Sequence, residues 1–203
     1  MPKFFLSLLL LAGLAGAPLQ AASPDSVLQL VETAPVETTL DHPDIPDAWQ
    51  VWPQMIDGAG KTLDFAEFYA STPPGGAASR LEPVLAALER AAGRGVRIRF
   101  LLDRKFTQTY PETVARLRAM KGTEVRTVDY GALAGGVQHA KYFLVDGREA
   151  YLGSQNFDWR SLEHIQELGV RVAQPTVVQF LADVFATERF PPYSKNLLFK
   201  IRA

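Results

Sequence analysis

A short part of the chain holds four residues whose side chains suit chemistry on a phosphate: His139, Lys141, Ser154 and Asn156. An imidazole can attack phosphorus and form a covalent phosphohistidine. An ammonium, a hydroxyl and an amide can stabilise the charge that builds on the non-bridging oxygens during that attack. Such a group could cleave a phosphodiester without a metal. The chain also has three His and no Cys, in no zinc-ligand spacing, so we expect no metal and no cofactor.

The elements expected to position these residues are two antiparallel strands at 137–145 and 149–153, joined by an Asp-Gly pair at 146–147. Asp-Gly favours a two-residue hairpin turn. In a hairpin with that turn, His139 would lie opposite Ser154.

Alternation of side chains along a strand extends this expectation to the neighbouring residues. Residues two apart point to the same face, so Lys141 would join His139, and Asn156 would join Ser154. Asp146 lies an odd number of positions from His139 and should therefore point to the opposite face. Its expected role is to hold the turn and the nearby backbone.

The spacing of these residues resembles a known family signature. His139-Ala-Lys141, Asp146 and the run from Gly153 to Asn156 match the histidine-lysine-aspartate motif of the phospholipase D superfamily at every position. The resemblance implies a phosphodiester hydrolase that acts on phospholipid or nucleic acid. Three further segments are similar to the first half of the lysosomal phospholipase D-like exonucleases: 30–34, 63–71 and 158–170.

The resemblance also implies roles for single residues. The motif histidine of the superfamily is the nucleophile or the acid for the leaving group, so His139 would have that role. Lys141 and Asn156 would bind phosphate, and Gly153 would be structural. A carboxylate that follows the second half of the motif hydrogen-bonds the histidine in the family, and Glu167 lies at the corresponding place.

Glu167 opens a predicted strand, Glu-Leu-Gly-Val-Arg-Val. In that strand Leu168, Val170 and Val172 are expected to face the core, and Glu167 and Arg171 to share the polar side. A carboxylate beside a catalytic imidazole fixes its tautomer and raises its basicity. The alternative is an exposed salt bridge between Glu167 and Arg171, which would contribute little stability.

The rest of the chain reads as alternating strands and helices. Strands are expected at 62–70, 96–102, 124–128 and 168–173, and helices at 79–92, 111–120 and 176–186. Together with the hairpin, this pattern predicts an α/β layered sandwich in which helices flank a mixed β-sheet, with one half of the catalytic motif in the chain.

The N-terminus resembles a secretory signal peptide at 1–22, because a lysine precedes an apolar run at 4–14 that is too short to span a bilayer. The rest, 23–203, is expected to be the catalytic domain, which starts with an acidic, Pro-containing entry segment at 23–60. No later stretch is long and apolar enough to cross a membrane. The mature chain is therefore expected to be secreted or periplasmic.

Charge is divided unevenly along the 203 residues, whose formal net charge is −1. Residues 22–67 carry nine acids against Lys61 alone, whereas Arg94 to Arg126 carries nine bases against three acids. This basic segment is either a solvated helical face or a surface that attracts a phosphate-bearing substrate. Arg104 and Lys105, which follow a predicted strand, are weak candidates for phosphate binding. Three aromatic residues could line a groove for bases or acyl chains, or pack structurally: Phe106, Tyr110 and Trp159.

The chain has one His-x-Lys motif, whereas enzymes of this superfamily use two. The second histidine must come from a second copy, as in a homodimer with a shared active site, or the chain is an inactive phosphate-binding remnant. For the active forms, phospholipid is slightly preferred as substrate, with hydrolysis or transfer of the headgroup. A nuclease with the same mechanism is the alternative. A Pro-Pro-Tyr-Ser stretch at 191–194 resembles the end of the second half of the longer relatives.

Overall fold

The computed structural model describes residues 28–189. The expected signal peptide at 1–22 and the Pro-Pro-Tyr-Ser stretch at 191–194 lie outside these residues. No helix within 28–189 combines the length and the apolar character needed to cross a membrane.

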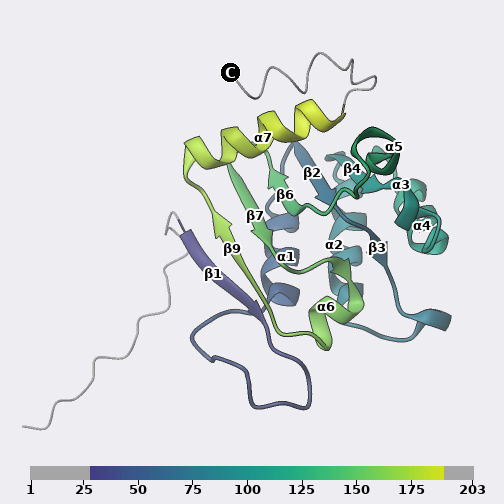
Figure 1. Ribbon diagram of the computed structural model, residues 1–203. Helices are drawn as coiled ribbons and strands as arrows, with labels where there is room; N and C mark the ends of the chain where they lie inside the picture. Colours follow the sequence, from purple (N-terminus) through teal and green to yellow (C-terminus); the bar gives the residue numbers. More distant parts are fainter. Residues whose placement is uncertain (1–27, 190–203) are drawn as a thin grey trace, which may run out of the picture.

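A mixed sheet of seven strands forms the centre of the fold, in the order β1-β9-β7-β6-β2-β4-β5 (Figure 1). Strands β2, β4 and β5 are parallel to one another, and the remaining neighbours are antiparallel. Two short strands, β3 (Ala70–Ser71) and β8 (Phe157–Asp158), pair separately. The strands of the large sheet are β1 (Leu28–Thr33), β2 (Thr62–Glu67), β4 (Arg97–Asp103), β5 (Thr123–Val128), β6 (Lys141–Val145), β7 (Glu149–Gly153) and β9 (Glu167–Val172).

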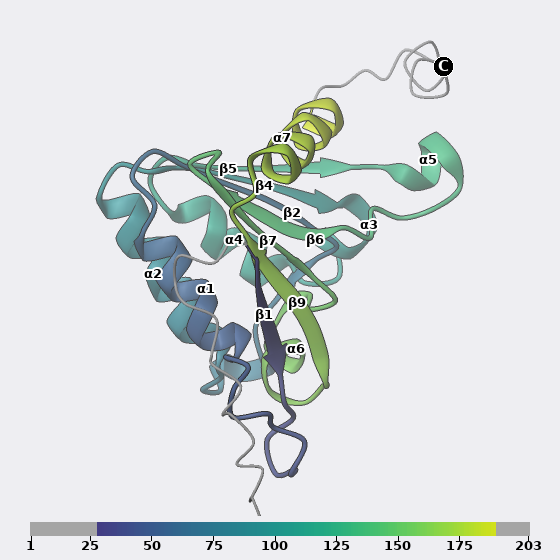
Figure 2. The same cartoon turned by 90° about the vertical axis from the view of Figure 1, so that its left-hand side faces the viewer.

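Helices cover both faces of the sheet, so the predicted layered α/β sandwich is confirmed. Figure 2 shows α1 (Ala48–Asp57) and α2 (Leu81–Gly93) on one side of the sheet and α7 (Pro175–Arg189) on the other. Helix α4 (Pro111–Ala119) packs into the same apolar cluster as α1 and α2. Short helical turns complete the set: η1 (Pro74–Gly76), α3 (Arg104–Thr107), α5 (Tyr130–Ala134) and α6 (Trp159–Glu163).

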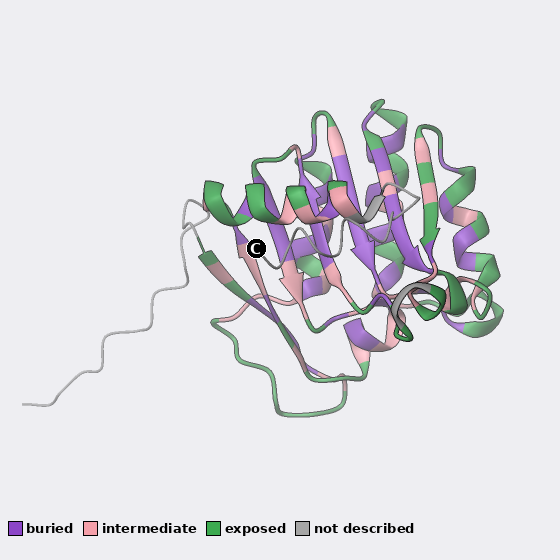
Figure 3. Ribbon diagram, turned by 45° about the horizontal axis from the view of Figure 1, so that its top comes forward, coloured by how far each residue is buried: buried purple, intermediate pink, exposed green. Residues whose placement is uncertain are grey.

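The alternation of buried side chains in β2 divides the core into two layers. Leu63 and Phe65 pack toward α1, α2 and α4, whereas Ala66 packs toward α7. Aromatic residues dominate the first layer, where the ring of Trp52 meets Phe143 edge-on at 5.8 Å. Figure 3 shows the buried strands between these layers and the largely exposed outer surface of α7. Burial of apolar area on both faces is the main stabilising contribution to such a sheet.

Regular structure begins earlier than the sequence indicated. No strand or helix was expected in the acidic entry at 23–60, yet this segment contributes β1 at the sheet edge and the core helix α1. Val51, Trp52 and Met55 of α1 are buried although Pro53 lies inside the helix. Proline in a helix removes one backbone hydrogen bond, and here the burial of the apolar side chains outweighs that loss.

Two expected strands are shorter than predicted. The strand expected at 62–70 ends at Glu67, and the chain resumes at Ala70 in β3, which pairs with β8 instead. The first hairpin strand begins at Lys141, so residues 137–140 form a loop. Both changes leave Phe68 and His139 in irregular backbone at the strand ends.

Candidate active site

The hairpin turn forms as predicted, but the register of the strands differs. Asp146 and Gly147 both have positive φ, 53° and 63°, and the Arg148 N–H donates to the carbonyl of Val145 at 3.0 Å. Val145 nevertheless pairs with Glu149, which leaves Arg148 as an extra residue. The prediction that His139 lies directly opposite Ser154 in a ladder is therefore wrong.

The candidate residues meet for a different reason, which is the direction of the strands. Strand β6 starts at the edge of the sheet where β2, β4 and β7 end and where β9 starts. His139 precedes β6, Ser154 and Asn156 follow β7, and Glu167 opens β9. Ligand sites of α/β proteins commonly lie at this carboxyl edge of the parallel strands.

His139 and Lys141 are in direct contact. The Lys141 Nζ lies 3.3 Å from each ring nitrogen of His139 and 3.1 Å from its carbonyl oxygen. The ring of Phe68 supports both residues, with its centroid 4.5 Å from the imidazole and 5.4 Å from the ammonium. Burial, and then the charge of Lys141, lowers the pKa of His139. The lowered pKa favours the neutral imidazole, which is the form that can attack phosphorus.

Asp103, at the end of β4, holds the loop that carries His139. Its buried carboxylate accepts hydrogen bonds from the N–H of Gln138 at 2.8 Å and the N–H of Lys105 at 2.9 Å. One carboxylate thus ties the residue before the histidine to the start of α3. The sequence pattern did not indicate this role for Asp103.

Glu167 contacts the serine of the motif. It accepts hydrogen bonds from the hydroxyls of Ser154 and, at 3.4 Å, Ser161. Ser154 also accepts from the N–H of Leu168 at 3.1 Å. Within the described part of the chain Glu167 makes no hydrogen bond to His139. Its charge also acts on Lys141. Burial lowers the pKa of Lys141, and the charges of Glu67 and Glu167 oppose that shift.

The alternative salt bridge between Glu167 and Arg171 is not formed. Arg171 pairs with Glu149, the Nε to Oε2 distance being 2.7 Å. The expectation that Leu168 faces the core is also wrong, because its side chain is 54% exposed. The apolar cluster under α7 includes Val172 of β9 but not Leu168, since the helix does not cover that end of the strand.

Glu67 is a site residue that the sequence reading did not identify. It lies directly opposite Lys141 in the pairing of β2 with β6, is 2% exposed, and its Oε2 has no hydrogen-bond partner in residues 28–189. Burial raises the pKa of Glu67 well above its ordinary value, and the charge of Lys141 opposes that rise. A single acid inside the apolar run Phe65 to Ala70 was the signal that could have revealed it.

Gly153 is required by close packing. A Cβ at this position would lie 2.5 Å from the Oε1 of Gln155 and 2.8 Å from the Cα of Gly169, so no side chain fits. The bend beyond Gly153 carries Asn156, whose N–H donates to Ser161 Oγ at 3.2 Å. The buried Oδ1 of Asn156 has no partner among the described residues.

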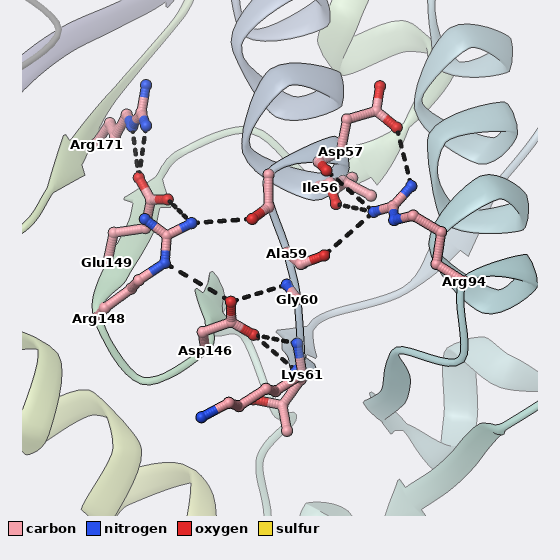
Figure 4. Close-up of polar contacts among 12 residues, drawn as sticks. Ile56, Asp57, Ala59, Gly60, Lys61, Arg94, Asp146, Arg148, Glu149 and Arg171 are labelled. Atoms are coloured by element: carbon pink, nitrogen blue, oxygen red, sulfur yellow. Dashed lines mark hydrogen bonds and ion pairs between the residues drawn. The ribbon is translucent and has the colours of Figure 1, made fainter.

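Asp146 lies at the opposite edge of the sheet from Lys141, at the other end of β6. Its carboxylate accepts hydrogen bonds from the N–H groups of Gly60 at 2.9 Å, Lys61 at 2.7 Å and Thr62 at 2.8 Å (Figure 4). Burial alone raises the pKa of Asp146, but these bonds and Arg148 bring it below its ordinary value. The residue connects the hairpin turn to the start of β2 and is remote from the histidine.

The basic segment does not form a continuous positive surface, because nearby acids pair with several of its arginines. Arg94 pairs with Asp57 at 3.6 Å, and Arg99 pairs with Asp64. Arg104 pairs with Asp129 at 3.1 Å. Lys105, by contrast, has no ion pair within 28–189, and its Nζ lies 5.9 Å from the ring centroid of Phe106.

Comparison with known proteins agrees with this arrangement. Residues 53–189 match the family described as "Cardiolipin synthase, PLD-like domain". The chain belongs to the phospholipase D superfamily. The crystal structure of the phospholipase D family member Nuc from Salmonella typhimurium has the same fold, with a TM-score of 0.60 at 21% identity, over 79% of this chain and 92% of that one.

Three curated relatives match most of this phospholipase D superfamily chain. The 5'-3' exonuclease PLD3 of Bos taurus is 37% identical over 70% of this chain and 30% of its own length. The virion nicking-joining enzyme of Vaccinia virus (strain Western Reserve) is 32% identical, over 74% and 35%. Phospholipase D Z of Dictyostelium discoideum is 35% identical, over 70% and 35%. The chain thus spans about a third of the length of these relatives.

Proposed function

We propose that the protein is a phosphodiesterase that cleaves nucleic acid through a covalent phosphohistidine at His139. The observation that carries this proposal is the imidazole of His139 held 3.3 Å from the ammonium of Lys141 at the carboxyl edge of the sheet. The ring supplies the nucleophile, and the ammonium offers the charge that a phosphate needs.

The proposed reaction has two displacements at phosphorus. In the first, a ring nitrogen of His139 forms a bond to phosphorus, and the bond from phosphorus to the leaving oxygen breaks. The leaving oxygen takes a proton from a second histidine, which enters the step as the protonated imidazolium. In the second, that histidine removes a proton from water, the water oxygen attacks phosphorus, and the phosphorus to nitrogen bond breaks. Lys141 and Asn156 bind the non-bridging oxygens throughout.

The second histidine is proposed to be His139 of another copy, in a homodimer with one shared site. A displacement in line at phosphorus needs nucleophile and acid on opposite sides, and the 203 residues hold one His-x-Lys motif. An open apolar groove of about 480 Å³ beside Lys141 supports a contact between copies there, since it is lined by Leu152, Leu168 and Leu181. A two-fold axis brings the same patch of both copies together.

Nucleic acid is favoured as the substrate by the names of two relatives, the exonuclease and the nicking-joining enzyme. The preference for phospholipid that the sequence suggested is not confirmed. Phospholipid remains the second candidate, because phospholipase D Z is 35% identical to the chain. We also propose that residues 1–22 direct the protein out of the cytoplasm as a signal peptide.

The test is an assay of the purified protein on single-stranded DNA, duplex DNA, phosphatidylcholine and cardiolipin in EDTA. We expect cleavage of DNA without added metal. Wild-type chains are then mixed with an excess of His139→Ala chains under conditions that allow exchange. Activity per wild-type chain should collapse, because mixed dimers hold one histidine. Activity that requires metal would refute the mechanism, and constant activity from a monomer would refute the shared site.

A further inference from the structure

Four aromatic side chains form a cluster that belongs to neither apolar core: Phe68, Tyr69, Phe106 and Tyr110. Each is half-buried, so part of its ring is open to solvent. Phe68 and Tyr69 follow β2, and Phe106 and Tyr110 lie in and after α3, which follows the neighbouring strand β4. These residues therefore extend the edge of the sheet that carries the candidate active site.

The rings form a continuous path that starts at the catalytic histidine. The centroid of Phe68 lies 4.5 Å from that of His139 and 4.1 Å from that of Phe106. Phe106 stacks with Tyr69 at 5.8 Å, and Tyr69 lies 5.2 Å from Tyr110. We define these four residues as the aromatic path. A ligand that contacts His139 is thus adjacent to a row of ring faces and edges.

The aromatic path leads into a cavity of about 850 Å³ lined in part by Tyr110, Trp159 and Arg160. The guanidinium of Arg160 lies 5.8 Å from the centroid of Tyr110 and 5.5 Å from that of Trp159. Arg160 is held by the fully buried Asp158. The guanidinium of Arg160 and the rings of Tyr110 and Trp159 therefore form a second group of flat surfaces, at the end of the aromatic path away from His139.

Positive side chains lie beside the rings of the aromatic path. This arrangement suits a polymer ligand that has phosphates on one side and flat groups on the other. Lys105 lies over the ring of Phe106 and has no ion pair within the described residues. Lys141 lies over the ring of Phe68. Burial raises the pKa of Tyr69 to about 12, so its phenol is neutral and does not repel a phosphate. Proteins that bind single strands combine basic groups with stacking aromatic rings in this way.

We propose that the aromatic path binds the bases of a single-stranded nucleic acid whose scissile phosphate lies at His139. This inference rests on the proposed function and names its substrate class. The bases of a duplex are already stacked on one another, so their faces are not available to these rings. Acyl chains of a lipid have no flat face to match, and the path has two tyrosine hydroxyls rather than aliphatic side chains.

The experiment uses Tyr110→Leu and Phe106→Leu, which keep apolar volume but remove the ring, with Phe106→Trp as the matched control that restores a ring. Probes are an oligothymidylate, an abasic oligomer of the same length and phosphatidylcholine vesicles. We expect wild type to have a lower KM for oligothymidylate than for the abasic oligomer. Each leucine variant should raise the oligothymidylate KM about tenfold, with kcat and the abasic KM unchanged. Phe106→Trp should stay near wild type.

Fluorescence anisotropy on the His139→Ala background measures binding without turnover and keeps the two proposals separate. Weaker binding of oligothymidylate by His139→Ala/Tyr110→Leu than by His139→Ala would support the aromatic path even if no diester were cleaved. Equal KM for oligothymidylate and the abasic oligomer in wild type would overturn it. So would leucine variants that raise both KM values equally, or that raise the KM for vesicles instead. Circular dichroism confirms that each variant is folded.

Discussion

The two residues at the centre of the site, His139 and Lys141, influence each other's protonation. Partial burial lowers the pKa of both, although the imidazole is largely exposed, and the ammonium lowers the pKa of the imidazole further. Removal of either group therefore changes both binding and chemistry. The side chain of His139 is exposed and outside both apolar clusters, so its loss should not unfold the protein.

Substitution at the proposed phosphate contacts should abolish most of the activity. His139→Ala removes the nucleophile, and we expect no measurable turnover at a normal melting temperature. Lys141→Ala or Asn156→Ala removes one donor to the developing charge, which typically costs on the order of a hundredfold in rate. Steady-state kinetics on single-stranded DNA measure this. A folded His139→Ala protein that retains activity would exclude the phosphohistidine.

Lys141→Gln should raise the pKa of His139, because the neutral amide removes the repulsion between two positive charges. The pKa should move toward the ordinary value of about 6.5 without exceeding it, since the partial burial remains. NMR titration of the ring protons measures this shift, and the His139→Ala spectrum assigns the resonance. An unchanged or lower pKa in Lys141→Gln would contradict the contact between the two side chains.

At the level of elements, the hairpin shows what local sequence can and cannot specify. The Asp-Gly pair at 146–147 was enough to predict the turn, since it favours positive φ at both positions. The extra residue Arg148 depends on pairing with distant strands, and no local pattern revealed it. Helix α1 was missed because Pro53 is a helix breaker in isolation, and only the buried Trp52 and Met55 explain why the helix persists.

Asp146→Asn should damage stability more than catalysis. The amide keeps one acceptor but turns an NH₂ donor toward backbone N–H groups. The free energy of unfolding should therefore fall by about 1–3 kcal/mol. Because the folded pKa is depressed, this contribution is present above the unfolded pKa of about 3.9 and is lost as pH falls through the folded pKa. Denaturant unfolding at several pH values tests this. An Asp146→Asn protein of normal stability but without activity would be inconsistent with a turn-holding role.

Glu67→Gln should stabilise the protein increasingly as pH rises. The raised folded pKa means that Glu67 loses its proton at a higher pH in the fold than in the unfolded chain, which ionises above about pH 4.3. Wild type therefore loses stability between the two pKa values, at most about 1.4 kcal/mol per pH unit for one proton, whereas glutamine does not titrate. Melting temperatures of both proteins should agree near pH 4 and diverge at higher pH. Parallel profiles would show that Glu67 is ionised in the fold.

At the scale of the whole molecule, the direction of the strands brings the site together. Glu67, Asp103, Lys141, Ser154 and Glu167 come from the ends of five different strands that meet at one edge. The sequence predicted the motif residues and the layered fold, because both depend on local patterns. It did not predict the contact of Glu167 with Ser154 or the burial of Glu67, because both depend on how separate strands align.

The covalent intermediate tests the central claim most directly. The protein is mixed with single-stranded DNA that carries a radioactive label at every phosphate, and the reaction is stopped in alkali, where phosphohistidine is stable. Peptide mapping then locates the label. The proposed mechanism predicts acid-labile label on the peptide that contains His139 and none in the His139→Ala protein. Turnover without label on the protein, or label that persists in His139→Ala, would contradict it.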